Sequence, residues 1–164
     1  NLPYNVATPI VIKLLGGFPR FHRLVLMFQD EVAKRLVAEP RTGAYGSLSV
    51  LAQAYSRVQY GFRLSPGSFY PAPKVHSAVV RFDLYDEPMF GGAPAQFFER
   101  VVRAGFMQRR KLLSNALGSQ FEKSIVVEVL EQTVGLKRRA EELSLEEWGH
   151  LVSVFQERLS ISSG

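Results

Sequence analysis

The sequence contains no cysteine and only three histidines, and each shortage excludes a class of site. Without cysteine the chain can form no disulfide, no thiolate metal site and no cysteine nucleophile. His22, His76 and His150 are too far apart to supply the ligand spacing of a zinc site, so we expect no bound metal. No apolar run approaches the roughly 20 residues that cross a bilayer, so we expect no membrane partner.

Common phosphate- and cofactor-binding motifs are also missing. The chain has no G-x-G-x-x-G, no P-loop, no G-x-S-x-G and no His–Glu zinc spacing. Its glycine pairs, Gly16-Gly17 and Gly91-Gly92, are typical of turns and linkers. The residues alone therefore reveal no cofactor site.

What is present is the composition of a basic globular protein. Hydrophobic residues make up 46% of the 164 residues, enough for one domain or two small ones. The net charge is +5, and the isoelectric point is about 9.7. Such a charge favours an anionic partner such as nucleic acid, although many basic domains bind nothing acidic.

The first half of the chain alternates predicted helices and strands. Apolar spacing and turn residues predict helices at 5–15, 29–37 and 47–55, and strands at 22–28, 57–64 and 75–84. The continuous apolar run of the first strand is typical of a strand covered on both faces. A short Pro/Gly-rich loop joins the last two strands. We therefore expect them to form an antiparallel edge hairpin on an otherwise parallel α/β sheet.

The second half is predicted to be helical. Residues 85–94 are the best linker candidate, because prolines and glycines interrupt every periodicity there. Beyond them we predict helices at 96–107, 110–117 and 122–134, and a last helix that opens with a capping box from Ser144 to Glu147. The fold class is thus α/β followed by all-α. The predicted domains are 1–85 and 95–164, with a linker at 86–94.

The chain begins with Asn1-Leu2-Pro3-Tyr4, and this tetrapeptide has two interpretations. The Asn1 side-chain oxygen and the Pro3 carbonyl can accept the two N–H bonds of an exocyclic amine, while Tyr4 offers its ring to the heterocycle. Acceptors placed in this way aim the nitrogen lone pair at an electrophile. Alternatively, the tetrapeptide is an ordinary strand-to-helix turn. A chain that begins inside such a site is expected to be the second half of an enzyme.

A second group of candidate residues lies at 69–77. Pro71 and Pro73 stiffen this loop, and Phe69 stands at its mouth. A rigidly held aromatic ring can stack on an extruded base opposite Tyr4. The alternative is a proline-rich hairpin whose Phe69 and Tyr70 fill the core.

Basic residues form a third group in the helical half. They are Arg100, Arg103, Arg109, Arg110 and Lys111, with Lys123, Lys137, Arg138 and Arg139 further on. If residues 97–111 formed one unbroken helix, four of the first five would share a face within about a third of a turn. Such a stripe can follow a phosphate backbone without reading sequence. A solvated charged face is the alternative.

Six segments in this order resemble one family closely. They are N-L-P-Y-N at 1–5, F-Q-D-E-V-A-K-R-L at 28–36, Y-G-S-L-S-V at 45–50, F-Y-P-A-P-K-V-H-S-A-V-V-R at 69–81, F-M-Q-R-R-K-L-L-S-N-A-L at 106–117 and R-R-A-E-E-L-S at 138–144. Together they are similar to the KsgA family of small-subunit (16S) ribosomal RNA adenine dimethyltransferases, and the likeness covers essentially the whole chain.

The resemblance implies the C-terminal half of a class I, Rossmann-like methyltransferase domain at 1–85 and a helical RNA-binding domain at 95–164. Enzymes of the family use S-adenosylmethionine to place two methyl groups on N6 of each of two adjacent adenines near the 3′ end of the small-subunit RNA. The implied partner is this RNA within the 30S subunit, acted on in the cytoplasm by a monomeric enzyme during ribosome biogenesis.

The resemblance also assigns roles to residues. Asn1 and the Pro3 carbonyl would hold the amine, and Tyr4 and Phe69 would stack on the adenine. Asn1 and Leu2 would lie close to the methyl donor. The glycine-rich loop and the acidic ribose-binding residue with which the family binds this donor lie upstream of the position of Asn1. The implied RNA contacts are Arg100, Arg103, Arg109, Arg110 and Lys111.

Two alternatives remain open. Because the upstream part is missing, S-adenosylmethionine is not expected to bind these 164 residues well, and they are expected to be inactive alone. The first alternative is therefore that the chain is a fragment or paralogue that only binds RNA or the ribosome.

The second alternative is an erythromycin-resistance-type enzyme acting on large-subunit RNA, although residues 41–50 resemble the small-subunit branch. His76 stands where the family pattern often has Asp.

Overall fold

A computed structural model of the chain describes residues 3, 6–16 and 21–162. The elements in chain order are α1 Ala7–Gly16, β1 Arg23–Gln29, α2 Asp30–Leu36, α3 Ser47–Tyr55, β2 Ser56–Leu64, η1 Pro66–Ser68, β3 Ser77–Leu84, α4 Ala95–Phe106, α5 Leu113–Leu117, α6 Lys123–Gln132, η2 Ala140–Glu142 and α7 Leu145–Ser162. Each predicted helix and strand is present, with small shifts at the ends. The predicted order, α/β and then all-α, is confirmed.

The three strands form one sheet in the order β1-β3-β2. β3 pairs antiparallel with both neighbours, which confirms the predicted antiparallel hairpin of β2 and β3 at the sheet edge. Among the described residues the sheet contains no parallel pair, since β1 and β2 run in the same direction on either side of β3. A register irregularity between Tyr60 and Arg63 interrupts the β2–β3 ladder shortly before the connecting loop.

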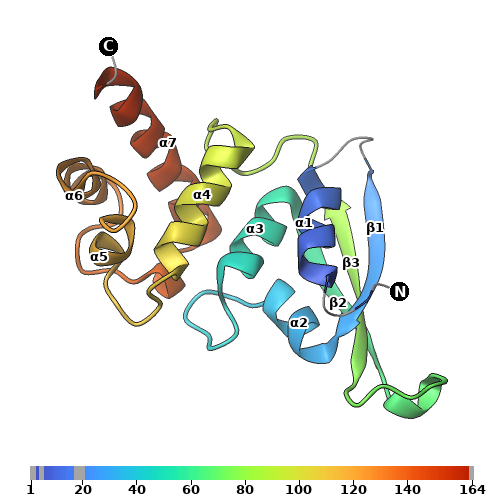
Figure 1. Cartoon of the computed structure of the whole chain (residues 1–164). Helices are drawn as coiled ribbons and strands as arrows, with labels where there is room; N and C mark the ends of the chain where they lie inside the picture. The colour runs from blue at the N-terminus through green and yellow to red at the C-terminus, as the bar shows by residue number, and fades with distance from the viewer. Residues whose placement is uncertain (1–2, 4–5, 17–20, 163–164) are drawn as a thin grey trace.

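One face of this sheet carries the core of the first half. Ala78, Val80 and Phe82 of β3 are fully buried at alternate positions, as a half-buried strand requires. Phe28 of β1 meets Phe82 edge-to-face, with ring centroids 6.1 Å apart. Figure 1 shows α1, α2 and α3 gathered on one side of the strands. The alternating apolar side chains therefore pack beneath these helices.

The opposite face of β1 is left open by the described residues, so the prediction that this strand is covered on both faces is wrong for this chain. Val25 is 60% exposed. Arg23 reaches Asp83 of β3 at 2.5 Å, and Arg81 reaches the same carboxylate at 2.8 Å. Within residues 3, 6–16 and 21–162, β1 is an outer strand paired only with β3, so an apolar run in its sequence does not by itself bury both of its faces.

The predicted linker is packed between the two halves. Phe90 is buried, with its ring centroid 4.8 Å from those of both Tyr55 and Phe98. Gly91 has a φ of 63°, and a Cβ there would lie 2.1 Å from the carbonyl oxygen of Gly149 in α7. Only glycine fits this close backbone approach. The division into domains at 86–94 stays a prediction.

The helical half is built around Trp148. This residue is fully buried and its ring stacks on Phe106 at a centroid distance of 5.7 Å. An apolar stripe along α7 packs beside it, since Leu151, Val152 and Phe155 are also fully buried. Gly105 of α4 lets the two helices approach, since a Cβ there would lie 2.6 Å from the indole ring of Trp148.

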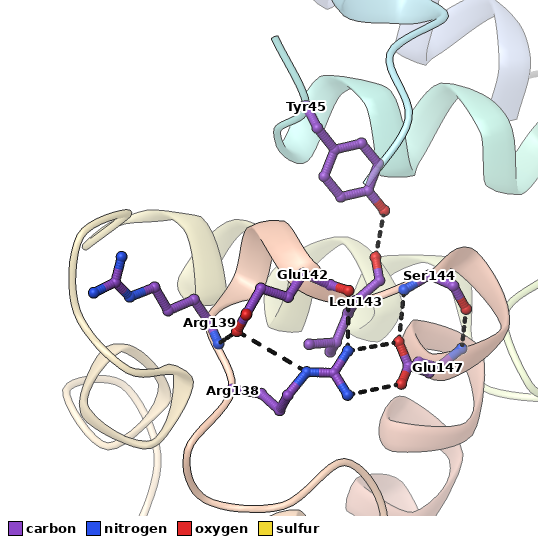
Figure 2. Close-up of polar contacts among 7 residues, drawn as sticks. All are labelled: Tyr45, Arg138, Arg139, Glu142, Leu143, Ser144 and Glu147. Carbon is purple, nitrogen blue, oxygen red and sulfur yellow. Dashed lines mark hydrogen bonds and ion pairs between the residues drawn. The ribbon is translucent and has the colours of Figure 1, made fainter. Parts of the chain in front are cut away.

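The start of α7 is fixed by a polar network, shown in Figure 2. Ser144 Oγ accepts the Glu147 backbone N–H at 3.2 Å, and the Ser144 N–H donates to the Glu147 carboxylate at 2.8 Å. This reciprocal pair confirms the predicted capping box. The Arg138 guanidinium donates to both oxygens of Glu147 at 3.1 Å and to the carbonyl of Glu142 at 3.0 Å. Arg138 therefore has a structural role at the helix start.

Candidate functional site

The amine-binding tetrapeptide lies only partly within the described residues. Asn1, Leu2 and Tyr4 are outside them, so their predicted roles stay predictions. Pro3 is exposed, and its carbonyl accepts the Val6 N–H at 3.1 Å, directly before α1 begins. This bond fixes the direction of the carbonyl relative to α1. A carbonyl oxygen has a second lone pair, so it can still accept a substrate N–H.

The aromatic loop between β2 and β3 presents its two rings differently. Phe69 is half-buried and follows the short helix η1, with its N–H donating to the Pro66 carbonyl at 3.2 Å. Tyr70, in contrast, is completely exposed. The alternative interpretation, in which Phe69 and Tyr70 both fill the core, is therefore wrong for Tyr70. Because Tyr4 lies outside the described residues, the pairing of Tyr4 with Phe69 stays a prediction.

A polar cluster at the foot of this loop was not predicted. Its centre is Asp30, the first residue of α2, which is only 8% exposed. Its carboxylate accepts the Tyr60 hydroxyl at 2.6 Å and pairs with Lys34 at 2.8 Å and with Arg63 at 3.5 Å. The hydrogen bond from Lys34, followed by that from Tyr60, holds the pKa of the carboxyl below its usual value.

Asp30 ties both ends of the aromatic loop to α2. Arg63 lies in β2 just before the loop, and the backbone carbonyl of His76, just after the loop, accepts the Asp30 backbone N–H at 2.9 Å. The i,i+4 spacing of Asp30 and Lys34 was visible in the sequence. The bond to Tyr60 joins residues 30 positions apart and depends on the fold.

The predicted RNA-binding residues do not form a single helical stripe. α4 ends at Phe106, so the premise of one unbroken helix over 97–111 is wrong. A turn follows instead, closed by the Met107 N–H on the Ala104 carbonyl and the Lys111 N–H on the Gln108 carbonyl. Similarly, the helix predicted at 110–117 begins only at Leu113.

Each of the five residues has its own surroundings. Arg100 lies over the Phe121 ring, 4.8 Å from its centroid, and Arg103 pairs with Glu99 at 3.7 Å. These two arginines line a groove along α4 with Gln96, Met107 and Gln120. Arg109 donates hydrogen bonds to the Glu141 carboxylate and the Gly43 carbonyl. The side chains of Arg110 and Lys111 are exposed and, among the described residues, have no hydrogen-bond or ion-pair partner.

The described residues do not by themselves fit the methyl donor. In residues 3, 6–16 and 21–162, no glycine-rich turn leads from a strand into a helix. The junction of β1 and α2 holds Asp30, whose carboxylate is already occupied by Tyr60 and Lys34. This described part also contains no cluster of three potential metal ligands. None of its helices is long and apolar enough to span a membrane.

The fold is one found among ribosomal RNA methyltransferases. A dimethyladenosine transferase from Plasmodium falciparum superposes with a TM-score of 0.85 at 24% identity, over 96% of this chain and 66% of its own. The 23S rRNA methyltransferase ErmE superposes with a TM-score of 0.62 at 24% identity, over 94% of this chain and 63% of its own. At these identities the likeness defines the fold alone.

The sequence defines the family. The profile of the ribosomal RNA adenine dimethylase family matches residues 1–157, so the chain belongs to this family, and the resemblance is confirmed. Ribosomal RNA small subunit methyltransferase A of Syntrophotalea carbinolica is 48% identical over 159 residues, which are 95% of this chain and 60% of that protein. The protein of the same name from Chlamydia trachomatis serovar D is 42% identical over 150 residues, covering 90% and 54%. The chain thus spans little more than half the length of these relatives.

Proposed function

We propose that the full-length protein is an S-adenosylmethionine-dependent enzyme that dimethylates N6 of two adjacent adenines near the 3′ end of small-subunit ribosomal RNA. The observation that carries this proposal is the family match over residues 1–157, which includes both the Asn1–Tyr4 and the Phe69 segments. The named relatives, at 42–48% identity, favour the small subunit over the erythromycin-resistance alternative.

In this proposal the substrate amine is held by two acceptors. The Asn1 side-chain oxygen and the Pro3 carbonyl each accept one N–H of the adenine amine, which turns the N6 lone pair away from the ring plane. The hydrogen bond from the Val6 N–H keeps the Pro3 carbonyl in a fixed direction before the substrate arrives, so this carbonyl loses less orientational freedom on binding. S-adenosylmethionine, bound by the upstream part together with Asn1 and Leu2, supplies the methyl group as a co-substrate.

Aromatic stacking holds the extruded base. Tyr4 and Phe69 stack on the two faces of the adenine. Because Phe69 is half-buried, its ring has less conformational entropy to lose when it stacks. Asp30 anchors the two ends of the loop that carries Phe69. Arg100, Arg103, Arg110 and Lys111 are proposed to contact the RNA backbone. The proposed substrate is the 30S subunit in the cytoplasm, met by a monomeric enzyme.

The test is methyl incorporation into unmethylated small subunits by the full-length enzyme. Asn1→Ala, Tyr4→Ala and Phe69→Ala are each expected to lower kcat/KM about tenfold or more, as removal of positioning contacts does. Tyr85→Ala is the matched control, because Tyr85 follows the opposite end of β3 from the Phe69 loop. Undiminished activity in the Asn1 and Tyr4 variants would contradict the site assignment.

The second candidate function concerns these 164 residues alone. Their described part does not fit the methyl donor, which favours a fragment that binds RNA or the ribosome without catalysing methyl transfer. Calorimetry with S-adenosylmethionine separates the two cases. We expect no binding by this chain and clear binding by the full-length protein. A clean binding isotherm for the 164-residue chain would refute the claim that it lacks the pocket.

A further inference from the structure

Arg109 belongs to the basic run 109–111 and is exposed, but its guanidinium is hydrogen-bonded to other parts of the protein. Its Nε donates to the Glu141 carboxylate at 3.1 Å, and its Nη2 donates to the Gly43 carbonyl at 2.7 Å. Glu141 lies in η2 of the helical half, whereas Gly43 lies in the loop between α2 and α3. The Arg109 guanidinium therefore links the turn after α4 to η2 in the helical half and to the α2–α3 loop in the first half.

Backbone contacts reinforce the same junction. The Arg41 N–H donates to the Glu141 carbonyl at 2.7 Å, and Arg41 holds a φ of 68°, which a non-glycine residue rarely adopts. A few residues on, the Tyr45 hydroxyl donates to the Leu143 carbonyl at 2.8 Å. The 41–45 loop is thus bonded at three points to the 141–143 segment and the turn that carries Arg109.

Arg110 and Lys111 stand on that same turn with exposed side chains that bind no partner in the part of the chain that the structure describes. Their direction relative to the first half of the chain depends on how firmly the turn is held. Arg109 is the only one of the three whose charge is already satisfied within the described structure, by Glu141. A guanidinium that already donates to Glu141 and to the carbonyls of Thr42 and Gly43 has less to gain from a phosphate than its two neighbours.

We propose that Arg109 is a positioning residue, not an RNA contact. Through Glu141 and the Gly43 carbonyl it fastens the 41–45 loop to η2, and so aims Arg110 and Lys111 at the RNA bound to the catalytic half. The RNA part of this inference rests on the proposed function. The fastening itself concerns only this chain.

Glu141→Gln gives the sharpest test, because the two possible roles of Arg109 predict opposite signs. If Arg109 contacted RNA, removing its acidic partner would free its charge and tighten binding. If Arg109 is a fastener, the loss of Glu141 loosens the turn and weakens binding although the net charge becomes more positive. We expect Glu141→Gln and Arg109→Gln in the full-length protein each to weaken binding to unmethylated 30S subunits about threefold.

The salt dependence of binding provides a second readout. Loss of a phosphate contact lowers the slope of log affinity against log salt concentration by about one, so Arg110→Gln should show that decrease. Arg109→Gln and Glu141→Gln should leave the slope unchanged. Arg109→Lys, which can reach one acceptor but not both, should give an intermediate affinity. Tighter binding by Glu141→Gln, or a slope lowered by about one in Arg109→Gln, would overturn the proposal.

Hydrogen exchange tests the fastening without RNA. In Arg109→Gln and Glu141→Gln the amide of Arg41 should exchange faster, whereas Arg110→Gln should leave its protection unchanged. Unchanged protection in both fastener variants would reject the role of Arg109. A protein that binds no small subunit at all would instead contradict the proposed function, and the exchange data would still decide whether Arg109 fastens the loop.

Discussion

The hydroxyl of Tyr45 donates a 2.8 Å hydrogen bond to the backbone carbonyl of Leu143, a residue 98 positions further along the chain. Tyr45 is almost fully buried, and its ring meets Phe106 edge-to-face at a centroid distance of 6.1 Å. One side chain therefore packs against α4 and satisfies a buried carbonyl just before α7. The two halves of the chain are joined by buried contacts as well as by the 85–94 segment.

Tyr45→Phe should lower the free energy of unfolding by about 1–2 kcal/mol, because the Leu143 carbonyl is left without its donor while the ring packing is kept. Denaturant unfolding measures the difference. Tyr70→Phe is the matched control, since Tyr70 is completely exposed and its hydroxyl makes no hydrogen bond to any residue that the structure describes. Equal stability of the two variants would show that the Tyr45 bond contributes nothing net.

Arg138 and Arg139 are adjacent, but only one should matter for stability. Arg138→Gln breaks the two-pronged pair with Glu147 that fixes the start of α7 and should cost about 2 kcal/mol. Arg139→Gln removes an exposed side chain and should change the free energy of unfolding by less than about 0.5 kcal/mol. Thermal unfolding of the pair checks this, and a larger loss in Arg139→Gln would contradict the network of Figure 2.

Gly105→Ala should be strongly destabilising. The added Cβ would lie 2.6 Å from the Trp148 ring and 3.0 Å from Leu113 Cδ1, inside a packed core that yields little. The expected loss is about 1–3 kcal/mol, or failure to fold. Gly43→Ala meets no atom within 4 Å and should be nearly neutral. Urea unfolding of the two variants compares them directly.

The Asp30 cluster predicts a defined pH dependence. Because the folded-state pKa of Asp30 is lowered, its charged form stabilises the fold above the unfolded pKa of about 3.9, and this stabilisation is lost as the pH falls through the folded value. Asp30→Asn should therefore lower Tm at pH 7, and its difference from the wild-type Tm should shrink below about pH 4.

Thermal scans between pH 3 and pH 7 measure this difference. Glu31→Gln is the control, since Glu31 is exposed and pairs with Arg35 on the helix surface. We expect it to change Tm much less than Asp30→Asn at pH 7. If the Tm of Asp30→Asn stays below the wild-type Tm by the same amount down to pH 3, the charge of Asp30 does not explain its contribution to stability.

Local pattern was enough to predict most elements. The apolar stripe and the Ser144–Glu147 capping box defined α7, and β-branched alternation defined β2 and β3. Such signals succeed because helix and strand periodicity and caps depend on neighbours within a few residues. The end of α4 was predicted to within one residue, because the helix expected at 96–107 ends at Phe106. The start of α5 was placed too early, because the basic residues predicted to open it lie in a turn and the helix begins only at Leu113.

The sequence by itself determined the family, the order of elements and the overall basic charge. Only the tertiary structure separated residues of identical chemistry: Arg109 binds Glu141 and Gly43, Arg138 binds Glu147, and Arg110 binds no partner among the described residues. It also gave Asp30 its hydroxyl partner, Tyr60. The reason is physical. A charge takes its role from the groups within about 4 Å of it, and for these residues those groups arrive from other elements through packing, which no local period encodes.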